Sequence, residues 1–240
     1  MWFIGDVHCR FLKYLSLVTE WVTPAGGVMD CSLQVGDMGV GLPARGKPPL
    51  LDESPIHEDQ PLLAPREKRL TQAPILSAAH KFIRGNHDNP ALCREHPCYL
   101  GDYGYLRKQE MCFVGGGYSV DFSERKAGFD WWSDEELPPE QLAEIVESFG
   151  DWKSRIVVSH ECPTVAKEHA VCNFSKISHS SRTETALQRM FEIHRPEIWV
   201  FGHHHYRVDV RIRGTRFVGL NEMIRGPIEE CVFEIPGLKW

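Results

Sequence analysis

Five short apolar runs in this chain each end at a glycine or serine followed by a polar residue, and this recurrence constrains the fold more than any other feature. The runs are residues 3–4, 31–35, 81–84, 155–158 and 198–201, and the polar residues after them are Asp6, Asp37, Asn86, His160 and His203. Short apolar runs bounded by turn residues are typical of buried strands. In α/β folds, functional sites lie at the carboxyl ends of strands. The recurrence therefore predicts a site built from these polar residues.

Other stretches have the spacing of amphipathic helices. Apolar residues within 142–149 share one face, with Pro139 near the start and Gly150 at the expected end. Apolar residues within 186–191 share another face, and Ser181 is placed to cap the start of that helix. An earlier helix is expected from the spacing of Phe11, Leu15, Val18 and Val22.

The rest of the chain contains one unusual stretch. Residues from Val40 to Pro74 include seven prolines, and a connection this long is either a functional lid or a mobile surface insertion. From Tyr206 onward apolar and polar residues alternate, with an expected turn at Gly214, which is typical of antiparallel strands. Because no repeat or linker is visible, we expect one domain over residues 1–240 with a proline-rich insertion at about 40–75.

Composition excludes several classes of function. The net charge of −6 argues against broad nucleic-acid binding, which needs a basic surface. No apolar run approaches the roughly 20 residues that cross a bilayer, and the N-terminus has neither a basic region nor a cleavage site. None of the eight cysteines lies in a C-x-x-C pair, so reduced thiols are expected rather than disulfides or a zinc ribbon. We therefore expect a cytoplasmic protein that binds neither membranes nor extended nucleic acid.

The polar residues after the strands have the chemistry of a site for two divalent metals. Asp6 and His8, at D-x-H spacing, can point at one ion, and the two oxygens of Asp37 can bridge two ions. Asn86 offers a carbonyl oxygen. Neutral imidazole is the commonest metal ligand in proteins, and it is available from His160, His203 and His205. A single histidine is more often a surface or core residue, so the prediction depends on the combination of five segments. Oxygen and nitrogen ligands without thiolate suit Mn, Fe, Zn or Ni.

The order of these motifs resembles that of the calcineurin-like metallophosphoesterases. The motifs are Asp6-Val7-His8, Gly36-Asp37, Gly85-Asn86-His87-Asp88, Ser159-His160 and Gly202-His203-His204-His205. The resemblance implies a mixed α/β (α+β) fold, a sandwich of two mixed β-sheets flanked by helices. It also implies two divalent metals, with manganese expected first. The first would be held by Asp6, His8 and His205, the second by Asn86, His160 and His203, with Asp37 bridging them. The proline-rich stretch and the Trp131-Trp132 pair also resemble phage and bacterial members of unassigned substrate.

Further residues beside these motifs are candidates for catalysis. His87 would reach the leaving oxygen as a general acid or a transition-state stabiliser, and Asp88 would orient its imidazole and keep it protonated. The alternative for Asp88 is a plain turn residue. Arg84 would contact phosphate oxygens, the alternative being a solvated arginine at a strand end. The chain departs from the family pattern at Cys9, which we interpret as filler, and at Val40, where an acidic residue or asparagine is usual and support for the bridging carboxylate is therefore expected to be weaker.

Together these residues predict a dinuclear metal-dependent phosphoesterase that cleaves phosphoester bonds with a metal-activated hydroxide. A phosphodiesterase acting on a small phosphoester is favoured, because the Asp-Arg-Gly motif of the related protein phosphatases is missing after Gly36-Asp37. A nucleotide is one candidate substrate, since Trp131 and Trp132 could stack a base, although such a pair more often packs on the core. The alternatives are a phosphomonoesterase, including a serine/threonine protein phosphatase, and a non-catalytic binding scaffold. A repair-type nuclease would need a capping domain and a basic groove.

Overall fold

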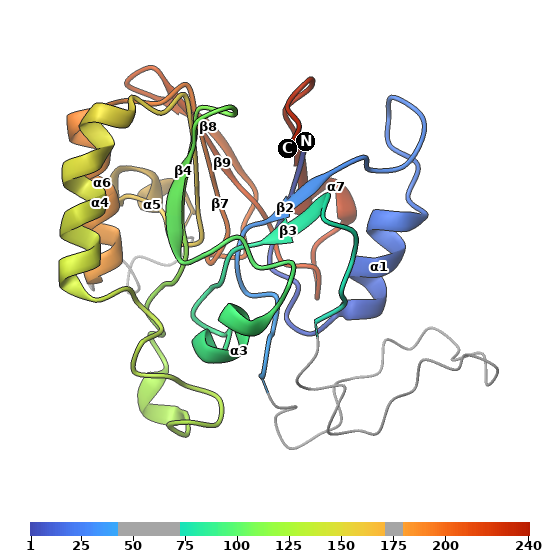
Figure 1. Ribbon diagram of the computed structural model, residues 1–240, viewed down its shortest axis with the longest axis horizontal. Helices are drawn as coiled ribbons and strands as arrows, with labels where there is room; N and C mark the ends of the chain where they lie inside the picture. Colours follow the sequence, from blue (N-terminus) through green and yellow to red (C-terminus); the bar gives the residue numbers. More distant parts are fainter. Residues whose placement is uncertain (43–72, 171–179) are drawn as a thin grey trace.

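Successive side chains of the short strands point to opposite faces of their sheet, and this alternation decides how the molecule is layered. In the computed structural model, which describes residues 1–42, 73–170 and 180–240, Phe3 of the first strand belongs to a core between two sheets. Its neighbours Trp2 and Ile4 belong to a second core, beneath the first helix. The six-stranded sheet repeats the pattern, because Ile156 and Val158 face the first sheet while Val157 faces helices. The molecule therefore has two sheets in the middle and helices on both outer faces (Figure 1).

Both sheets contain parallel and antiparallel strands, as expected. The four-stranded sheet has the order β10-β1-β2-β3, and its β10–β1 pair is antiparallel. The six-stranded sheet has the order β4-β5-β6-β7-β9-β8, with antiparallel pairs at both edges. The strands are β1 (Trp2–Ile4), β2 (Ser32–Gln34), β3 (His80–Phe82), β4 (Tyr103–Leu106), β5 (Met111–Val114), β6 (Ile156–Ser159), β7 (Ile198–Phe201), β8 (Val208–Ile212), β9 (Thr215–Gly219) and β10 (Val232–Glu234).

Helices cover the outer face of each sheet. α4 and α6 lie on the six-stranded sheet, and α1 lies on the other side of the molecule, against the four-stranded sheet (Figure 1). The helices are α1 (Phe11–Thr19), α3 (Pro90–Glu95), η1 (Phe122–Glu124), α4 (Pro139–Trp152), α5 (Thr164–Ala170), α6 (Arg182–Ile193) and α7 (Ile228–Cys231). This arrangement leaves the loops at the carboxyl ends of the parallel strands free to form a site.

Most local predictions agree with these elements. Ser181 caps α6, because its side chain accepts a hydrogen bond from the Glu184 amide, and β8 and β9 form the antiparallel pair that turns at Gly214. The predicted end of α4 at Gly150 is wrong: the helix continues to Trp152, and Lys153 ends it in a left-handed conformation with φ of 48°.

Several sequence predictions concern segments that lie wholly or partly outside the described residues. Residues 43–72 of the proline-rich stretch and Cys172 fall there. The seven cysteines within the described ranges are free thiols. No helix in the described ranges is long and apolar enough to cross a membrane.

Candidate metal centre

The loops after five strands bring the predicted polar residues together. Asp6 and His8 follow β1, Asp37 follows β2, and Asn86 follows β3. The loops after β6 and β7 of the other sheet add His160, His203 and His205. Backbone contacts join the two sheets at this point. The His203 amide donates to the Asp6 carboxylate at 3.1 Å, and His160 Nδ1 lies 3.0 Å from the Val35 carbonyl oxygen.

One group of ligand atoms surrounds the end of β1. The donor atoms of Asp6, His8, Asp37 and His205 all lie within 4.8 Å of one another. Nε2 of His205 is 3.0 Å from Oδ2 of Asp6 and 2.9 Å from Nε2 of His8. His8 Nε2 is also 3.8 Å from Oδ2 of Asp37. This is the set predicted for the first metal, together with the predicted bridge.

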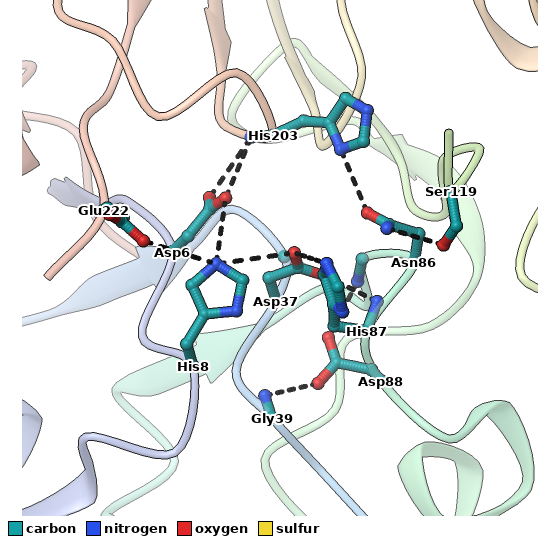
Figure 2. A network of polar contacts seen from close by, with 12 residues as sticks. Asp6, His8, Asp37, Gly39, Asn86, His87, Asp88, Ser119, His203 and Glu222 are labelled. Atoms are coloured by element: carbon teal, nitrogen blue, oxygen red, sulfur yellow. Dashed lines mark hydrogen bonds and ion pairs between the residues drawn. The ribbon is translucent and has the colours of Figure 1, made fainter. Parts of the chain in front are cut away.

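A second group lies on the other side of Asp37. Oδ1 of Asn86 is 3.0 Å from His160 Nε2 and 3.0 Å from His203 Nδ1. His160 Nε2 is 3.4 Å from Oδ1 of Asp37. One oxygen of Asp37 therefore faces each group, and Figure 2 shows Asp37 between His8 on one side and Asn86 with His203 on the other.

An unpartnered carboxylate oxygen and several converging ligand atoms in this cluster fit two divalent cations. Oδ2 of Asp37 is buried and has no hydrogen-bond partner among the described residues, whereas buried polar atoms are normally paired. The facing Nε2 atoms of His8 and His205 cannot both be protonated at 2.9 Å without repulsion. Converging carboxylate, amide and imidazole donors are what divalent transition metals prefer. The residues present therefore fit the predicted metals.

Burial favours the uncharged form of several candidate ligands, whereas at His205 the contact with Asp6 outweighs burial and raises the pKa. Removal from water raises the pKa of Asp37 well above its usual value and lowers the pKa of His8 and His160 well below theirs. For the same reason the pKa of His203 falls to about 4. The neutral imidazole that results is the form that binds metal, and a nearby divalent cation would favour the ionised carboxylate.

The backbone is strained at several of these residues. His8, Asp37, His203 and His205 have φ values of 47°, 56°, 64° and 54°, in the left-handed region that side chains other than glycine rarely adopt. Such conformations persist where the surroundings enforce them, and they cluster at functional sites. The strain lies at four of the seven predicted ligands.

Glycine is required next to the ligands because the chain segments pass very close together. A Cβ on Gly85 would lie 2.1 Å from Oδ1 of Asp37 and 2.6 Å from Nε2 of His160. A Cβ on Gly202 would lie 2.2 Å from Oδ1 of Asp6. Any side chain at either position would displace a candidate ligand, which explains the glycines in the motifs.

A further set of possible ligands lies beside the second group. Oε1 of Glu161 is 2.8 Å from Nε2 of His204, and Oε2 is 3.4 Å from Nε2 of His203. Burial opposes the charge on Glu161, but the two imidazoles outweigh that effect and lower its pKa. Glu161 thus pairs with His204 and contacts Nε2 of His203, whereas Nδ1 of His203 faces Asn86.

His87 lies at the edge of the cluster, as its sequence position suggested. Its amide donates to Oδ1 of Asp37 at 2.8 Å, and its ring lies 3.8 Å from Oδ2 of the same carboxylate. Arg125 contacts both ring nitrogens, with Nη1 2.6 Å from Nδ1 and Nη2 3.1 Å from Nε2. Burial, then the nearby His8 and Arg125, lower the pKa of His87 well below its usual value. These surroundings favour a neutral imidazole rather than the protonated one expected.

Asp88 has a different role from the predicted one. Its carboxylate does not orient His87; it accepts hydrogen bonds from the backbone amides of Met38, Gly39, Val40 and Gly85 at 2.6–3.2 Å. Figure 2 shows the bond to Gly39. Asp88 therefore joins the loop of the bridging ligand to the loop of Asn86, and it supports the loop in which the sequence predicted weaker support at Val40.

Arg84 is also placed differently from both sequence interpretations. Its side chain is fully buried, with Nε 2.5 Å from Oδ1 of Asp102 and Nη1 2.6 Å from the Glu135 carbonyl oxygen. This guanidinium is therefore not a solvated arginine at a strand end, and the contacts of its Nε and Nη1 are with Asp102 and Glu135. Arg84 instead holds the end of β3 against neighbouring loops.

Sequence reasoning missed two charged residues of the site. Glu222 lies 3.5 Å from Nδ1 of His205; it follows the apolar end of β9, so the strand-end rule could have found it. Arg125 lies in the segment between β5 and α4, where no motif marks it. Its side chain is 4% exposed, and Asp121 holds the guanidinium through contacts of 2.7 and 2.9 Å. Cys9 is a partly buried thiol near the Gly39 carbonyl oxygen, and burial raises its pKa to about 12, which agrees with a filler.

Comparison with known proteins identifies one family. The family model for calcineurin-like phosphoesterases matches residues 1–207. No curated protein matches the chain.

Three solved structures show a distant likeness over most of this chain. Phosphopantetheinyl hydrolase from Mycobacterium tuberculosis is 14% identical with a TM-score of 0.46, covering 98% of this chain and 95% of its own. A hypothetical protein from Thermus thermophilus is 17% identical with a TM-score of 0.40, covering 95% and 81%. A putative 5'-nucleotidase from Staphylococcus aureus, in complex with alpha-ketoglutarate, is 13% identical with a TM-score of 0.43, covering 92% and 48%. The two activities in these names are those of the proteins that carry them.

Proposed function

The chain belongs to the calcineurin-like phosphoesterase family, and on that premise we propose that it hydrolyses a small phosphoester, with a phosphodiester favoured over a monoester. Members of the family are phosphoester hydrolases with a dinuclear metal centre. The observation that supports the proposal most is Asp37, whose two oxygens face two separate groups of donors while Oδ2 has no partner among the described residues.

The proposed ligand assignment divides the cluster at Asp37. Asp6, His8 and His205 would hold the first ion, Asn86, His160 and His203 the second, and Asp37 would bridge. Manganese is our first choice, with iron, zinc or nickel also suited to these donors. When bound, the two ions would supply positive charge to the phosphoryl oxygens and acidify a water.

His87 and Arg125 would bind the substrate beside the ligands. His87 lies 3.8 Å from Oδ2 of Asp37, and Arg125 contacts the ring of His87, so a phosphoryl group at the cluster comes within their reach. A neutral imidazole still donates one N–H to an oxygen, and a guanidinium is a preferred partner of phosphate. Because Asp121 keeps the Arg125 side chain in place, little freedom is lost when substrate binds.

The preference for a diester rests on charge. A diester carries one negative charge and a monoester up to two, so a monoesterase benefits from more cations. Arg84 is buried against Asp102, which leaves this guanidinium unavailable to a second phosphate charge. Trp132 is buried as well, so this tryptophan gives no support to base stacking, and the proposed leaving group is a small alcohol.

A substrate screen of the manganese-loaded protein tests the proposal. The panel is bis-nitrophenyl phosphate, nitrophenyl phosphate, cyclic nucleotides and a phosphopeptide, with Asp37→Asn as the control that should lose metal and activity together. We expect the diesters to give the highest kcat/KM. A preference for nitrophenyl phosphate or the phosphopeptide would replace the diesterase with a monoesterase. Absence of turnover on every substrate, with no bound metal, would instead favour the scaffold.

A further inference from the structure

Asn86 is oriented by residues outside the predicted ligand set. Its Nδ2 donates to Oγ of Ser119 at 2.9 Å, and Oγ of Ser119 lies 2.6 Å from Oε2 of Glu135. The amide of Ser119 donates to Oε1 of the same carboxylate at 2.9 Å. Ser119 and Glu135 are 2% and 3% exposed, so water offers little competition for these bonds.

The direction of these hydrogen bonds follows from their chemistry. An ionised carboxylate only accepts, and a serine hydroxyl has a single hydrogen. Ser119 must therefore donate to Glu135 and accept from Asn86. This leaves Asn86 with its NH₂ toward Ser119 and its Oδ1 toward His160 and His203, the arrangement that Figure 2 shows on the Ser119 and His203 sides.

The orientation matters because the two ends of an amide differ as ligands. The oxygen of Asn86 can bind a cation, whereas its NH₂ group donates hydrogen bonds and has no lone pair to offer. A flipped amide would present that NH₂ group to the second group of donors. Side chains behind a metal ligand commonly change metal affinity by 10- to 100-fold when they are altered.

We propose that Ser119 and Glu135 are positioning residues, a hydrogen-bond relay that directs Oδ1 of Asn86 into the second metal subsite. The inference rests on the proposed function, because it needs a metal at that subsite. It assigns a role to the segment between β5 and α4, which also provides Arg125.

The relay makes a distinctive prediction for Glu135→Gln. Glutamine has nearly the same shape, but its amide can accept from the Ser119 backbone and donate to Oγ. The hydrogen of Ser119 would then lose its acceptor, and Asn86 can replace that acceptor only by turning its oxygen toward Ser119 and its NH₂ group toward His160 and His203. We therefore expect the second manganese Kd to rise about 10- to 100-fold, with the first Kd and the unfolding temperature close to wild type. Ser119→Ala removes the anchor and should weaken the same site less.

A rescue experiment separates this account from general damage. Asn86→Asp places an oxygen at both ends of the side chain, so the direction of the relay no longer matters. Glu135→Gln should therefore cost little second-site affinity in the Asn86→Asp background, while costing about 10- to 100-fold in the wild-type background. Titration calorimetry with manganese measures both Kd values. The titration is done at about pH 8, because burial raises the pKa of Glu135 and the carboxylate must be ionised in the wild-type relay.

Two matched controls alter buried polar side chains outside the relay. Ser154→Ala removes a buried hydroxyl whose Oγ has no hydrogen-bond partner among the described residues. Glu136→Gln alters the neighbouring buried carboxylate, which accepts from the Thr183 amide at 2.9 Å. Both variants should bind two manganese ions normally. Equal losses of second-site affinity in the controls, or an unchanged second-site Kd in Glu135→Gln, would overturn the relay and leave the proposed function standing. A wild-type chain without a second site would overturn the proposed function with it.

Discussion

His87 lies between a carboxylate and a guanidinium, and this position defines what it can do. Its ring is 3.8 Å from Oδ2 of Asp37 and in contact with Arg125. Positive charge next to an imidazole disfavours a second proton on the ring. The histidine is therefore better placed to donate a hydrogen bond to a developing negative charge than to deliver a proton. Either role makes His87 important for turnover and unimportant for holding metal.

His87→Asn should leave manganese content near the wild-type value and lower kcat. The expected loss is about 100-fold on an ester with a poor leaving group, the usual range for a positioned acid or donor. A nitrophenyl ester should show a smaller defect, because its leaving group needs less help. Full activity of the variant on the poor leaving group would remove His87 from the mechanism.

Arg125→Met should weaken inhibition by inorganic phosphate. A hydrogen bond to a charged group contributes about 1.5–3 kcal/mol, so the inhibition constant should rise about tenfold or more. Manganese content should not change, since Arg125 is not a candidate ligand. Arg94→Met is the control, because Arg94 is 49% exposed and pairs with Asp102 outside the cluster. An unchanged inhibition constant in Arg125→Met would show that this arginine serves only to hold His87.

At the residue scale, sequence reasoning found the groups that strand ends mark and missed those that distant segments provide. Asp37 and His160 follow apolar runs, so their place in one cluster could be predicted. Arg125 reaches the cluster from a segment with no strand-end signal. Asp88 was misjudged because adjacency to His87 in sequence suggested contact, whereas four backbone amides compete more successfully for its oxygens.

At the element scale, buried charge joins the strand ends to the loops that follow. Arg84 at the end of β3 pairs with Asp102, which also accepts from Arg94 and from Tyr99. Burial alone would raise the pKa of Asp102, but Arg84 and its other partners outweigh burial and lower it. A carboxyl whose pKa is lower in the folded chain stabilises the fold at neutral pH. That contribution is lost as pH falls through the folded pKa.

Asp102→Asn should therefore destabilise the metal-free protein at neutral pH and matter less in acid. Breaking a buried pair leaves Arg84 without a counter-charge and costs about 3 kcal/mol. The difference in unfolding free energy between Asp102→Asn and wild type should shrink as pH falls from about 5 toward about 3. Urea unfolding with a chelator present measures it. Asp209→Asn breaks an exposed pair with Arg216 and should cost about 1 kcal/mol or less. A difference for Asp102→Asn that does not change with pH would contradict this account.

Elements were predicted better than their assembly. Strand and helix positions follow from local spacing and caps such as Ser181. Sheet membership does not, because β10 joins β1 from the other end of the chain, and β9 pairs in parallel with β7 as well as with its hairpin partner β8. The end of α4 was placed too early because Gly150 suggested a stop, whereas Lys153 provides the left-handed residue. The family resemblance, and not the local pattern, is what implied two mixed sheets.

At the scale of the whole molecule, the candidate centre connects both sheets. Asp6, Asp37 and Asn86 come from the four-stranded sheet, and His160, His203 and His205 come from the six-stranded one. Metal bound between them would be lost when the sheets separate. A ligand that binds only the folded state stabilises it by mass action, so metal content and global stability should change together.

Manganese should accordingly raise the unfolding temperature of the chelator-treated protein. At a free concentration about 100 times Kd the gain is about 2.7 kcal/mol, or about 5–10 °C for a chain of this size. Asp37→Asn should show little of this shift, because it weakens both subsites. A similar shift in wild type and Asp37→Asn would place the stabilising metal elsewhere.

The most direct test of the central claim is to locate manganese by anomalous diffraction in crystals of the manganese-loaded protein. Two peaks are predicted about 3.5–4 Å apart, one among Asp6, His8 and His205 and the other among Asn86, His160 and His203, with Asp37 between them. A single peak, or a peak in the Glu161–His203–His204 group in place of the Asp37 pair, would contradict the dinuclear centre.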